Sequence, residues 1–217
     1  MTWTLLVPVK VVSQAKTRLA GDLGPAERVD LVQAMVLDTL SAARDAPMVS
    51  QVLVVTDDAH IVAGLAATAG APVEVVPEPV PAQGLNAAIR AGIAHARSAA
   101  PVPVAVLLGD LPALRPADLD AALTAATRHA LAVVVDADGT GTTLLTASAG
   151  VELLPAFGAG SAAEHLRRGH VELDVPARCG LRQDVDVLTD LVAVAALGPG
   201  PRTAEVLDSL VGRLAPA

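Results

Sequence analysis

The sequence predicts an α/β protein with a mostly parallel sheet, and three observations support that fold class. Apolar runs alternate with longer segments of helical periodicity almost throughout the chain. The run at 102–108 has no charged or polar side chain, as expected for a central parallel strand covered on both faces. The 217 residues suit one α/β domain, so we predict a single domain over residues 1–217.

The predicted elements follow from apolar periodicity and from residues that begin or end helices. Pro25 suits the first turn of a helix, and apolar residues recur at helical spacing from Val29 to Leu40. Strands are expected at 4–9, 51–56, 73–76, 102–108, 130–136, 142–146 and 171–175. Helices are expected at 25–45, 59–69, 84–98, 116–128, within 158–169, within 184–197 and at 202–214. Segment 130–175 departs from strict alternation and predicts a small β-rich insertion with room for a second ligand site.

Composition and charge exclude several classes of function. The formal net charge is -8 and no basic run appears, which argues against a nucleic-acid partner. No apolar segment reaches the ~20 residues needed to span a bilayer, and no cationic region precedes an apolar one as in a signal peptide. The single cysteine, Cys179, rules out an intrachain disulfide and fits a reducing cytosol. We therefore predict a cytoplasmic protein with no membrane partner. The sequence leaves the oligomeric state open, a homodimer included.

Asp110 follows the predicted central strand, with only Gly109 between them. In open α/β sheets, ligands bind outside the carboxyl ends of the strands, so a metal or a charged ligand would meet this carboxylate. A helix cap or a turn is the other interpretation of the same position.

Cations gather in the polar loop that follows the first strand. The chain has only two lysines, Lys10 and Lys16, and both lie there with Arg18. Lysine is a compact point charge and arginine adds a planar fork, so the trio indicates a grip for a triphosphate. A solvated basic loop is the simpler alternative. The loop lacks the P-loop pattern, so it is not a Walker-type nucleotide site.

Asp184 and Asp186 are two residues apart in a segment expected to be extended, so both carboxylates would point to the same face. With Asp110 they make three hard oxygen donors, the kind that holds Mg²⁺ against phosphate oxygens. The alternative is that the two acids cap the helix that begins near Val187.

The remaining candidates each have a structural alternative. Gly139 to Thr142 would either wrap an oxyanion or form a tight hairpin turn. Gly158 and Ser161 would form a nest of backbone N–H groups, or Ser161 would cap a helix. Asn86 would contact a nucleotide or cap its helix. Of the five histidines only His165 lies near the glycine loop, where it would reach a phosphate, and the other four are expected at the surface.

Several motifs in this order carry a family resemblance. They are Pro8-Val9-Lys10, Ala15-Lys16-Thr17-Arg18-Leu19, Gly84-Leu85-Asn86-Ala87-Ala88-Ile89, Gly109-Asp110-Leu111-Pro112, Gly139-Thr140-Gly141-Thr142, Phe157-Gly158 with Ser161 and His165, and Leu181-Arg182 with Asp184-Val185-Asp186. From about Thr4 to Leu197 the chain resembles the guanylyltransferases of coenzyme F-420 biosynthesis, which act on 2-phospho-L-lactate or phosphoenolpyruvate.

The resemblance implies a fold, a reaction and site residues. The fold would be a Rossmann-like three-layer α/β/α sandwich of the nucleotide-diphosphosugar transferase, GT-A-like, type, with one nucleotidyltransferase domain over 1–217. The reaction would be Mg²⁺-dependent transfer of GMP from GTP to a phosphorylated three-carbon acid, releasing pyrophosphate. The implied roles are Asp110, Asp184 and Asp186 for Mg²⁺; Thr142, Gly158 and Ser161 for the acid; Lys10, Lys16, Arg18, Asn86 and Gly109 for the nucleotide; and Lys16, Arg18 and Asp110 for catalysis.

The chain departs from the family pattern near the residues implied to bind the phosphorylated three-carbon acid. In the family an Arg commonly follows the residue that matches Asp136, but here that position is Ala137. Before Ser161 the family often has an Asp, where this chain has Gly160, and before His165 it has an Arg, where this chain has Glu164. Val187 and Leu188 replace a Thr-Pro pair after the paired aspartates. The acceptor therefore stays open between phosphoenolpyruvate, 2-phospholactate and another phosphorylated compound. A GTP-binding module with little activity is the rival that is not an enzyme.

Overall fold

The computed structural model describes residues 1–11, 16–65, 70–79 and 84–214. Within them, one sheet holds the strands in the order β3-β2-β1-β4-β6-β5-β7. The strands are β1 (Trp3–Pro8), β2 (Val49–Val55), β3 (Val73–Val76), β4 (Val104–Leu107), β5 (Leu131–Val135), β6 (Thr142–Ala147) and β7 (Val171–Glu172). The strand β6 pairs antiparallel with both β4 and β5, whereas the other described pairs are parallel. The predicted mostly parallel α/β class is confirmed.

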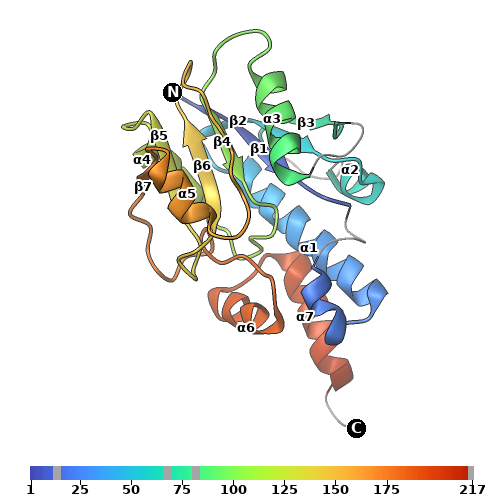
Figure 1. Cartoon of the computed structure of the whole chain (residues 1–217). Coiled ribbons are helices and arrows are strands. Elements are labelled where there is room, and N and C mark those ends of the chain that lie inside the picture. The colour runs from blue at the N-terminus through green and yellow to red at the C-terminus, as the bar shows by residue number, and fades with distance from the viewer. Residues whose placement is uncertain (12–15, 66–69, 80–83, 215–217) are drawn as a thin grey trace.

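Helices cover both faces of this sheet (Figure 1). They are α1 (Pro25–Arg44), α2 (Ala59–Leu65), α3 (Leu85–Ala96), α4 (Pro116–Ala126), α5 (Ser161–Arg167), α6 (Leu188–Leu197), α7 (Pro201–Leu214) and the 3-10 helix η2 (Thr17–Gly21). Alternate residues of β1 show the two faces. Leu5 and Val7 join the apolar cluster formed with α1 and α4, and Leu6 joins the cluster formed with α3. The three layers follow from this alternation.

Several boundaries differ from those expected. The strand predicted at 102–108 is described as β4 only from Val104. Pro103 accepts the Thr4 N–H through its carbonyl but has no N–H of its own to donate to a ladder. The loop at 10–24 contains η2, which the polar sequence did not indicate. The helix predicted at 59–69 is described to Leu65, and 66–69, 12–15 (with Ala15 of the lysine motif) and 80–83 lie outside the described residues.

Segment 130–175 does not form a separate insertion. Its strands β5, β6 and β7 continue the main sheet on the far side of β4. The reversed direction of β6 is the departure from alternation that the sequence indicated. Because β6 runs against β4, its first residue, Thr142, lies at the edge where β4 ends, so this segment contributes to the same site as Asp110.

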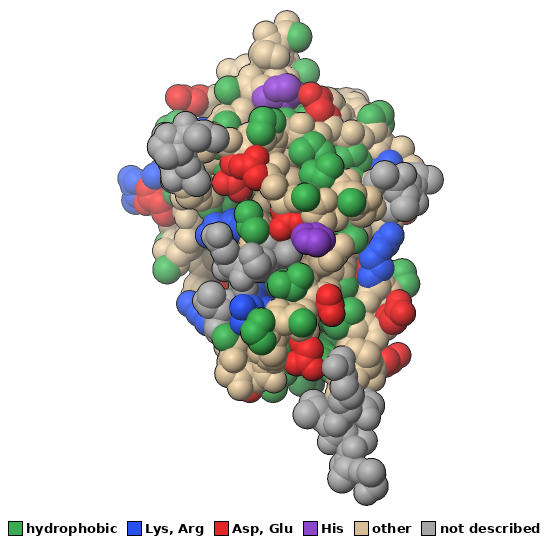
Figure 2. All heavy atoms as spheres, turned by 90° about the vertical axis from the view of Figure 1, so that its right-hand side faces the viewer, with side chains coloured by type: hydrophobic (Ala, Val, Ile, Leu, Met, Phe, Trp, Pro, Cys, Tyr) green, Lys and Arg blue, Asp and Glu red, His purple; other side chains and the backbone are tan. Residues whose placement is uncertain are grey.

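The carboxyl-terminal helix α7 packs beside α1 (Figure 1). Asp38 of α1 is buried and its carboxylate accepts the Thr203 N–H at 2.7 Å and the Arg202 N–H at 3.3 Å. This carboxylate therefore satisfies amides of the first turn of α7. The face of the molecule in Figure 2 mixes charged, polar and apolar side chains. None of the helices among the described residues has the length and apolar character needed to cross a membrane.

Candidate active site

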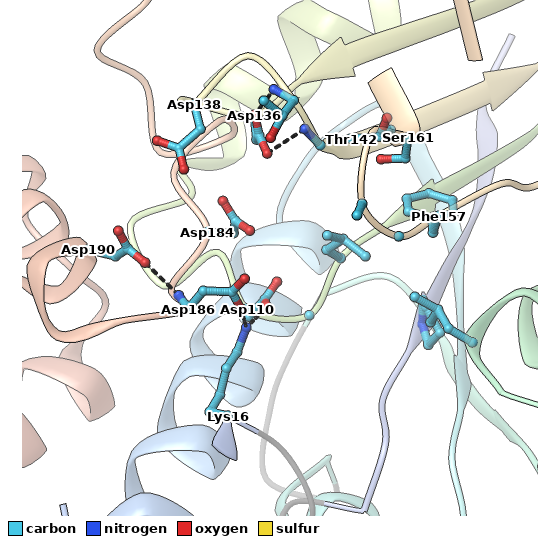
Figure 3. Close-up of a pocket in the computed structure, with 18 of the residues that line it drawn as sticks. Lys16, Asp110, Asp136, Asp138, Thr142, Phe157, Ser161, Asp184, Asp186 and Asp190 are labelled. Carbon is cyan, nitrogen blue, oxygen red and sulfur yellow. Dashed lines mark hydrogen bonds and ion pairs between the residues drawn. The ribbon is translucent and has the colours of Figure 1, made fainter. Parts of the chain in front are cut away.

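A cavity of about 640 Å³ opens at the carboxyl ends of β1, β4 and β5 (Figure 3). Lys10 lies on its wall just after β1, Asp110 after β4, and Asp136 and Asp138 after β5. Thr142 joins them from the start of the antiparallel β6. The position agrees with the rule that ligands of open α/β sheets bind beyond the carboxyl ends of the strands.

Three aspartates meet in this cavity. Asp110, Asp184 and Asp186 each offer a carboxylate oxygen, and these oxygens lie within 4.8 Å of one another (Figure 3). The second oxygen of Asp110, Oδ1, is buried and has no hydrogen-bond partner among the described residues. The interpretation of Asp184 and Asp186 as helix caps is wrong. Instead, Asp190 caps α6, because its Oδ2 accepts the N–H groups of Asp186 and Val187 at 2.7 and 2.8 Å.

Lys16 brings a positive charge between two of these acids. Its Nζ donates to Asp110 and, at 2.8 Å, to Asp186. The backbone of Lys16 is left-handed, with φ 51°, which is uncommon outside glycine and indicates a constrained position. Arg18 approaches Asp186 at 3.4 Å but is 72% exposed, and Lys10 is exposed on the wall. The three cations predicted from the sequence therefore share this end of the cavity.

The acids titrate differently because their surroundings differ. Burial, followed by the charge of Asp110, raises the pKa of Asp184 to about 7. Burial opposes ionisation of Asp186 too, but the hydrogen bond and charge of Lys16 hold the pKa of that carboxyl below its usual range. Burial would lower the pKa of Lys16, yet Asp110 and Asp186 raise it above its usual value. Near neutral pH, Asp184 therefore holds a proton more readily than Asp186 does.

Two residues that the sequence analysis did not single out hold the Asp110 loop. Thr39 of α1 is fully buried, and its hydroxyl donates to the Met35 carbonyl at 2.8 Å and accepts the Leu111 N–H at 3.1 Å. Gly180 lies against the backbone of Ala113, so closely that a Cβ there would overlap the Ala113 carbonyl. These contacts fix the loop after β4 against α1 and against the segment that carries Asp184.

Replacing Thr39 by Val leaves the buried Leu111 N–H without its acceptor. We expect Thr39→Val to lower the free energy of unfolding by about 2 kcal/mol, the cost of one unsatisfied buried group. Chemical denaturation measures this loss. Thr143→Val is the matched control, since its buried hydroxyl makes only a 3.5 Å contact with the Val134 carbonyl and its loss should cost less. Equal losses in the two variants would contradict the anchoring role of Thr39.

Gly180→Ala should destabilise the protein by about 1–3 kcal/mol, as overpacking does where backbone must move. Gly21→Ala is the control, because a Cβ at Gly21 meets nothing within 4 Å and its φ is ordinary. Thermal unfolding of both variants checks the comparison. An unchanged melting temperature for Gly180→Ala would show that the loop of Ala113 gives way without cost.

The turn that leads into β6 is organised by Asp136. Its carboxylate accepts the Thr140 N–H at 2.9 Å and the Gly141 N–H at 2.7 Å, and the Asp136 N–H donates to the Gly141 carbonyl. A Cβ on Gly141 would overlap this carboxylate, so the position requires glycine. The hairpin interpretation of Gly139 to Thr142 is therefore confirmed. The same turn places Thr142 on the cavity wall.

The loop before α5 faces the same cavity. Gly158, Gly160 and Ser161 line it, and both glycines have positive φ, 135° and 72°. Gly160, rather than Ser161, is the N-cap of α5, so the capping interpretation of Ser161 is wrong. Glu164 pairs with Arg167 and Arg168 at the surface and does not line the cavity. Of the two departures from the family pattern in this loop, only Gly160 reaches the cavity.

Asn86 and the histidines differ from their simplest expectations. The Asn86 side chain exchanges two hydrogen bonds with the Phe157 backbone, at 2.9 and 2.8 Å, and neither caps its helix nor lines the cavity. It ties α3 to the Gly158 loop. His165 is fully buried with both ring nitrogens in contact with protein, and it does not line the cavity. His170 is also buried, so the expectation that it lies at the surface is wrong.

Solved structures with the same architecture define the class of fold. A protein from Desulfovibrio desulfuricans described as a nucleotide-diphospho-sugar transferase aligns with a TM-score of 0.72 and 18% identity, covering 98% of each chain. A manganese complex of Rv0371c from Mycobacterium tuberculosis aligns with a TM-score of 0.50 and 22% identity, covering 89% of this chain and 98% of that one. The chain therefore has the fold of the nucleotide-diphospho-sugar transferases.

The family follows from comparisons of sequence. Residues 3–214 match the family described as guanylyl transferase CofC like, and the chain belongs to that family. A relative from Sanguibacter keddieii named phosphoenolpyruvate guanylyltransferase is 63% identical, covering 95% of this chain and 84% of the relative. One of the same name from Streptomyces coelicolor is 50% identical, covering 97% and 98%. The resemblance predicted from the motifs is confirmed.

Proposed function

We propose that this guanylyltransferase moves GMP from GTP to the phosphate of phosphoenolpyruvate, or of 2-phospho-L-lactate, and releases pyrophosphate. The observation that carries the proposal is a single cavity with two chemically different sides. One side holds Lys10, Lys16 and Arg18 beside the three aspartates. The other holds Thr142 and Ser161, together with Asp138 and with Asp136, whose carboxylate accepts N–H groups of its own turn. The names of the relatives favour phosphoenolpyruvate as the acceptor.

The three aspartates fit a divalent metal. Their oxygen donors suit a hard cation, and the partnerless Oδ1 of Asp110 is a buried acceptor that a cation would satisfy. We propose Mg²⁺, held by Asp110, Asp184 and Asp186. When bound, it would neutralise negative charge on the phosphates of GTP. The manganese complex of the Mycobacterium tuberculosis protein shows that a protein of this fold can take a divalent cation.

The cations of the first loop would stabilise the leaving pyrophosphate. An oxygen of the acceptor phosphate attacks the α-phosphorus, the bond from that phosphorus to the bridging oxygen breaks, and pyrophosphate leaves with the electron pair. Lys16 and Arg18 would stabilise the charge that builds on it, with Lys10 contributing from the wall. Gly109, which lines the cavity next to Asp110, would contact the nucleotide.

Neutral groups would hold the acceptor. Gly158 and Ser161 line the cavity from a loop with two positive-φ glycines, and Thr142 lines it from the start of β6. The acceptor phosphate is mostly dianionic at pH 7, because its second pKa is about 6, and it therefore needs no general base. The described lining cations, Lys10, Lys16 and Arg18, all come from the first loop, so the acid would bind through these donors and through charge neutralisation by the metal.

Metal affinity should rise with pH around neutrality. Asp184 must lose its proton to bind a cation, and its pKa without metal is about 7. Below pH 6 most molecules carry this proton on Asp184 and would have to release it before Mg²⁺ binds, whereas above pH 8 few molecules carry it. Calorimetric titration of Mg²⁺ at pH 6 and pH 8 should show about tenfold tighter binding at pH 8. The same affinity at both pH values would contradict the role of Asp184 as a ligand.

Pyrophosphate release with a matrix of substrates tests the proposed function. GTP and ATP are each combined with phosphoenolpyruvate, 2-phospholactate, a sugar phosphate or molybdopterin, with and without Mg²⁺. The proposal predicts release with GTP, Mg²⁺ and one of the two acids. Release only with a sugar phosphate or molybdopterin would point to another acceptor for the same fold. GTP binding without release from any mixture would indicate a binding module.

A further inference from the structure

His165 connects two parts of the acceptor side from behind the cavity wall. Its side chain is fully buried, and both of its ring nitrogens lie at hydrogen-bond distance from protein atoms. Nδ1 is 2.9 Å from the hydroxyl oxygen of Thr142, and Nε2 is 3.0 Å from the backbone nitrogen of Ala156. Thr142 lines the cavity and His165 does not.

The contact with Ala156 determines where the imidazole proton lies. A backbone N–H can only donate, so Nε2 of His165 must accept and cannot carry a proton. A neutral imidazole then has its proton on Nδ1, which donates to the Thr142 hydroxyl oxygen. Burial, with smaller effects of His170 and Arg168, lowers the pKa of His165 to about 4, so the ring stays neutral at the pH of the cell.

Neighbouring groups hold the ring in this orientation. The Phe157 ring packs edge-on against it with centroids 5.3 Å apart, and the His170 ring lies at 5.4 Å. His170 Nδ1 is 2.9 Å from the His165 carbonyl, which fixes the backbone of the end of α5. The imidazole therefore contacts two neighbouring rings and is hydrogen-bonded at both nitrogens, so it has little freedom to turn.

We propose that His165 is a positioning residue that makes the Thr142 hydroxyl a hydrogen-bond donor to the anionic acceptor. Thr142 lines the cavity although it is only 2% exposed. Because its hydroxyl oxygen already accepts from Nδ1–H, and no other hydrogen bond of this hydroxyl is found among the described residues, its own proton is left for a ligand at this wall. Such a donor favours an ionised phosphate or carboxylate oxygen over a group that itself carries a proton. This inference rests on the proposed function, since it assigns the acceptor's partner in the same cavity.

Two substitutions separate the two contacts of the ring. In His165→Asn the amide nitrogen lies near the place of Nδ1 and can still donate to Thr142. In His165→Gln the amide oxygen lies near the place of Nε2 and can still accept from Ala156, but the donor to Thr142 is lost. We expect KM for the acid to rise about tenfold in the Gln variant and much less in the Asn variant. KM for GTP should stay the same in both.

A double-mutant cycle then tests whether His165 acts through Thr142. In the Thr142→Val background, His165→Gln should produce no further rise in KM for the acid. A full further rise would overturn the inference, because His165 would then act independently of the hydroxyl. Equal KM values for the wild type and the Gln variant would overturn it as well.

Nitrogen NMR of the wild-type protein labelled at histidine tests the tautomer without any turnover. The expected spectrum shows His165 protonated at Nδ1 and unprotonated at Nε2 at neutral pH. A proton at Nε2 would overturn the inference whatever the enzyme does. If no acid releases pyrophosphate with the wild type, the proposed function fails and acceptor selection by His165 fails with it, while the spectrum reports separately on the buried bond.

Discussion

Asp184→Asn should lower turnover by about a thousandfold or more and at the same time raise the stability of the protein. The loss follows from removing one of three charged donors at the proposed metal. The gain follows from linkage. The pKa of Asp184 is about 7 in the folded state against an ordinary value of 3.8, so the folded state binds the proton more tightly and stability falls as pH rises from about 4 to 7.

At pH 8, without metal, the neutral amide should add about 1–2 kcal/mol to the free energy of unfolding, after allowance for solvent screening. Denaturation at pH 5 and pH 8 with a chelator present measures this gain, which should shrink at pH 5. Asp138→Asn is the control, because Asp138 lies on the same wall outside the group of three. It should change turnover by less than about threefold. A destabilised Asp184→Asn protein at pH 8 would contradict the electrostatic account.

Lys16→Met should slow turnover by about a hundredfold or more and yet tighten metal binding in the absence of nucleotide. Without metal, the Lys16 ammonium bridges Asp110 and Asp186 and supplies the positive charge that a metal ion would otherwise bring to these carboxylates. Its removal leaves the acids facing one another, so the metal-free protein should unfold at a lower temperature and Mg²⁺ should raise that temperature more than in the wild type. Turnover falls because the leaving pyrophosphate loses a cation.

Arg18→Met provides the comparison for this prediction. Arg18 is exposed and contacts Asp186 at 3.4 Å, so its loss should change the stability of the metal-free protein by less than about 1 kcal/mol. Thermal scans with a chelator and with Mg²⁺, combined with pyrophosphate release, measure both variants. If Lys16→Met weakened Mg²⁺ binding, Lys16 could not be a competitor of the metal for these acids.

The meeting of Asp110, Asp184 and Asp186 could be predicted because their geometry is local or follows from the sheet. Asp184 and Asp186 share a face through the two-residue repeat of extended backbone, and Asp110 follows a central strand. The sequence left both the cap and the ligand interpretation open for these acids. The structure rules out the cap interpretation, because Asp190 already supplies the cap of α6.

The buried contacts of the acceptor side could not be predicted in the same way. The bond between Thr142 and His165 joins residues 23 positions apart, and the bonds between Asn86 and Phe157 span 71. Neither pair has a periodic signal, because the contacts arise when α5 and α3 pack on the sheet. The role of Thr39 could not be predicted for the same reason, since its hydroxyl accepts from a loop 72 residues away. Of these residues, the reversed strand β6 brings Thr142 to the cavity.

Transfer of labelled phosphate tests the central claim most directly. The protein is incubated with Mg²⁺, phosphoenolpyruvate and GTP labelled at either the α- or the γ-phosphate, and the products are separated. Attack on the α-phosphorus predicts that the α-label moves to the acid as part of a new diphosphate, while the γ-label appears in pyrophosphate. A γ-label on the acid, or its release as orthophosphate, would contradict guanylyl transfer at the cavity of Asp110, Asp184 and Asp186.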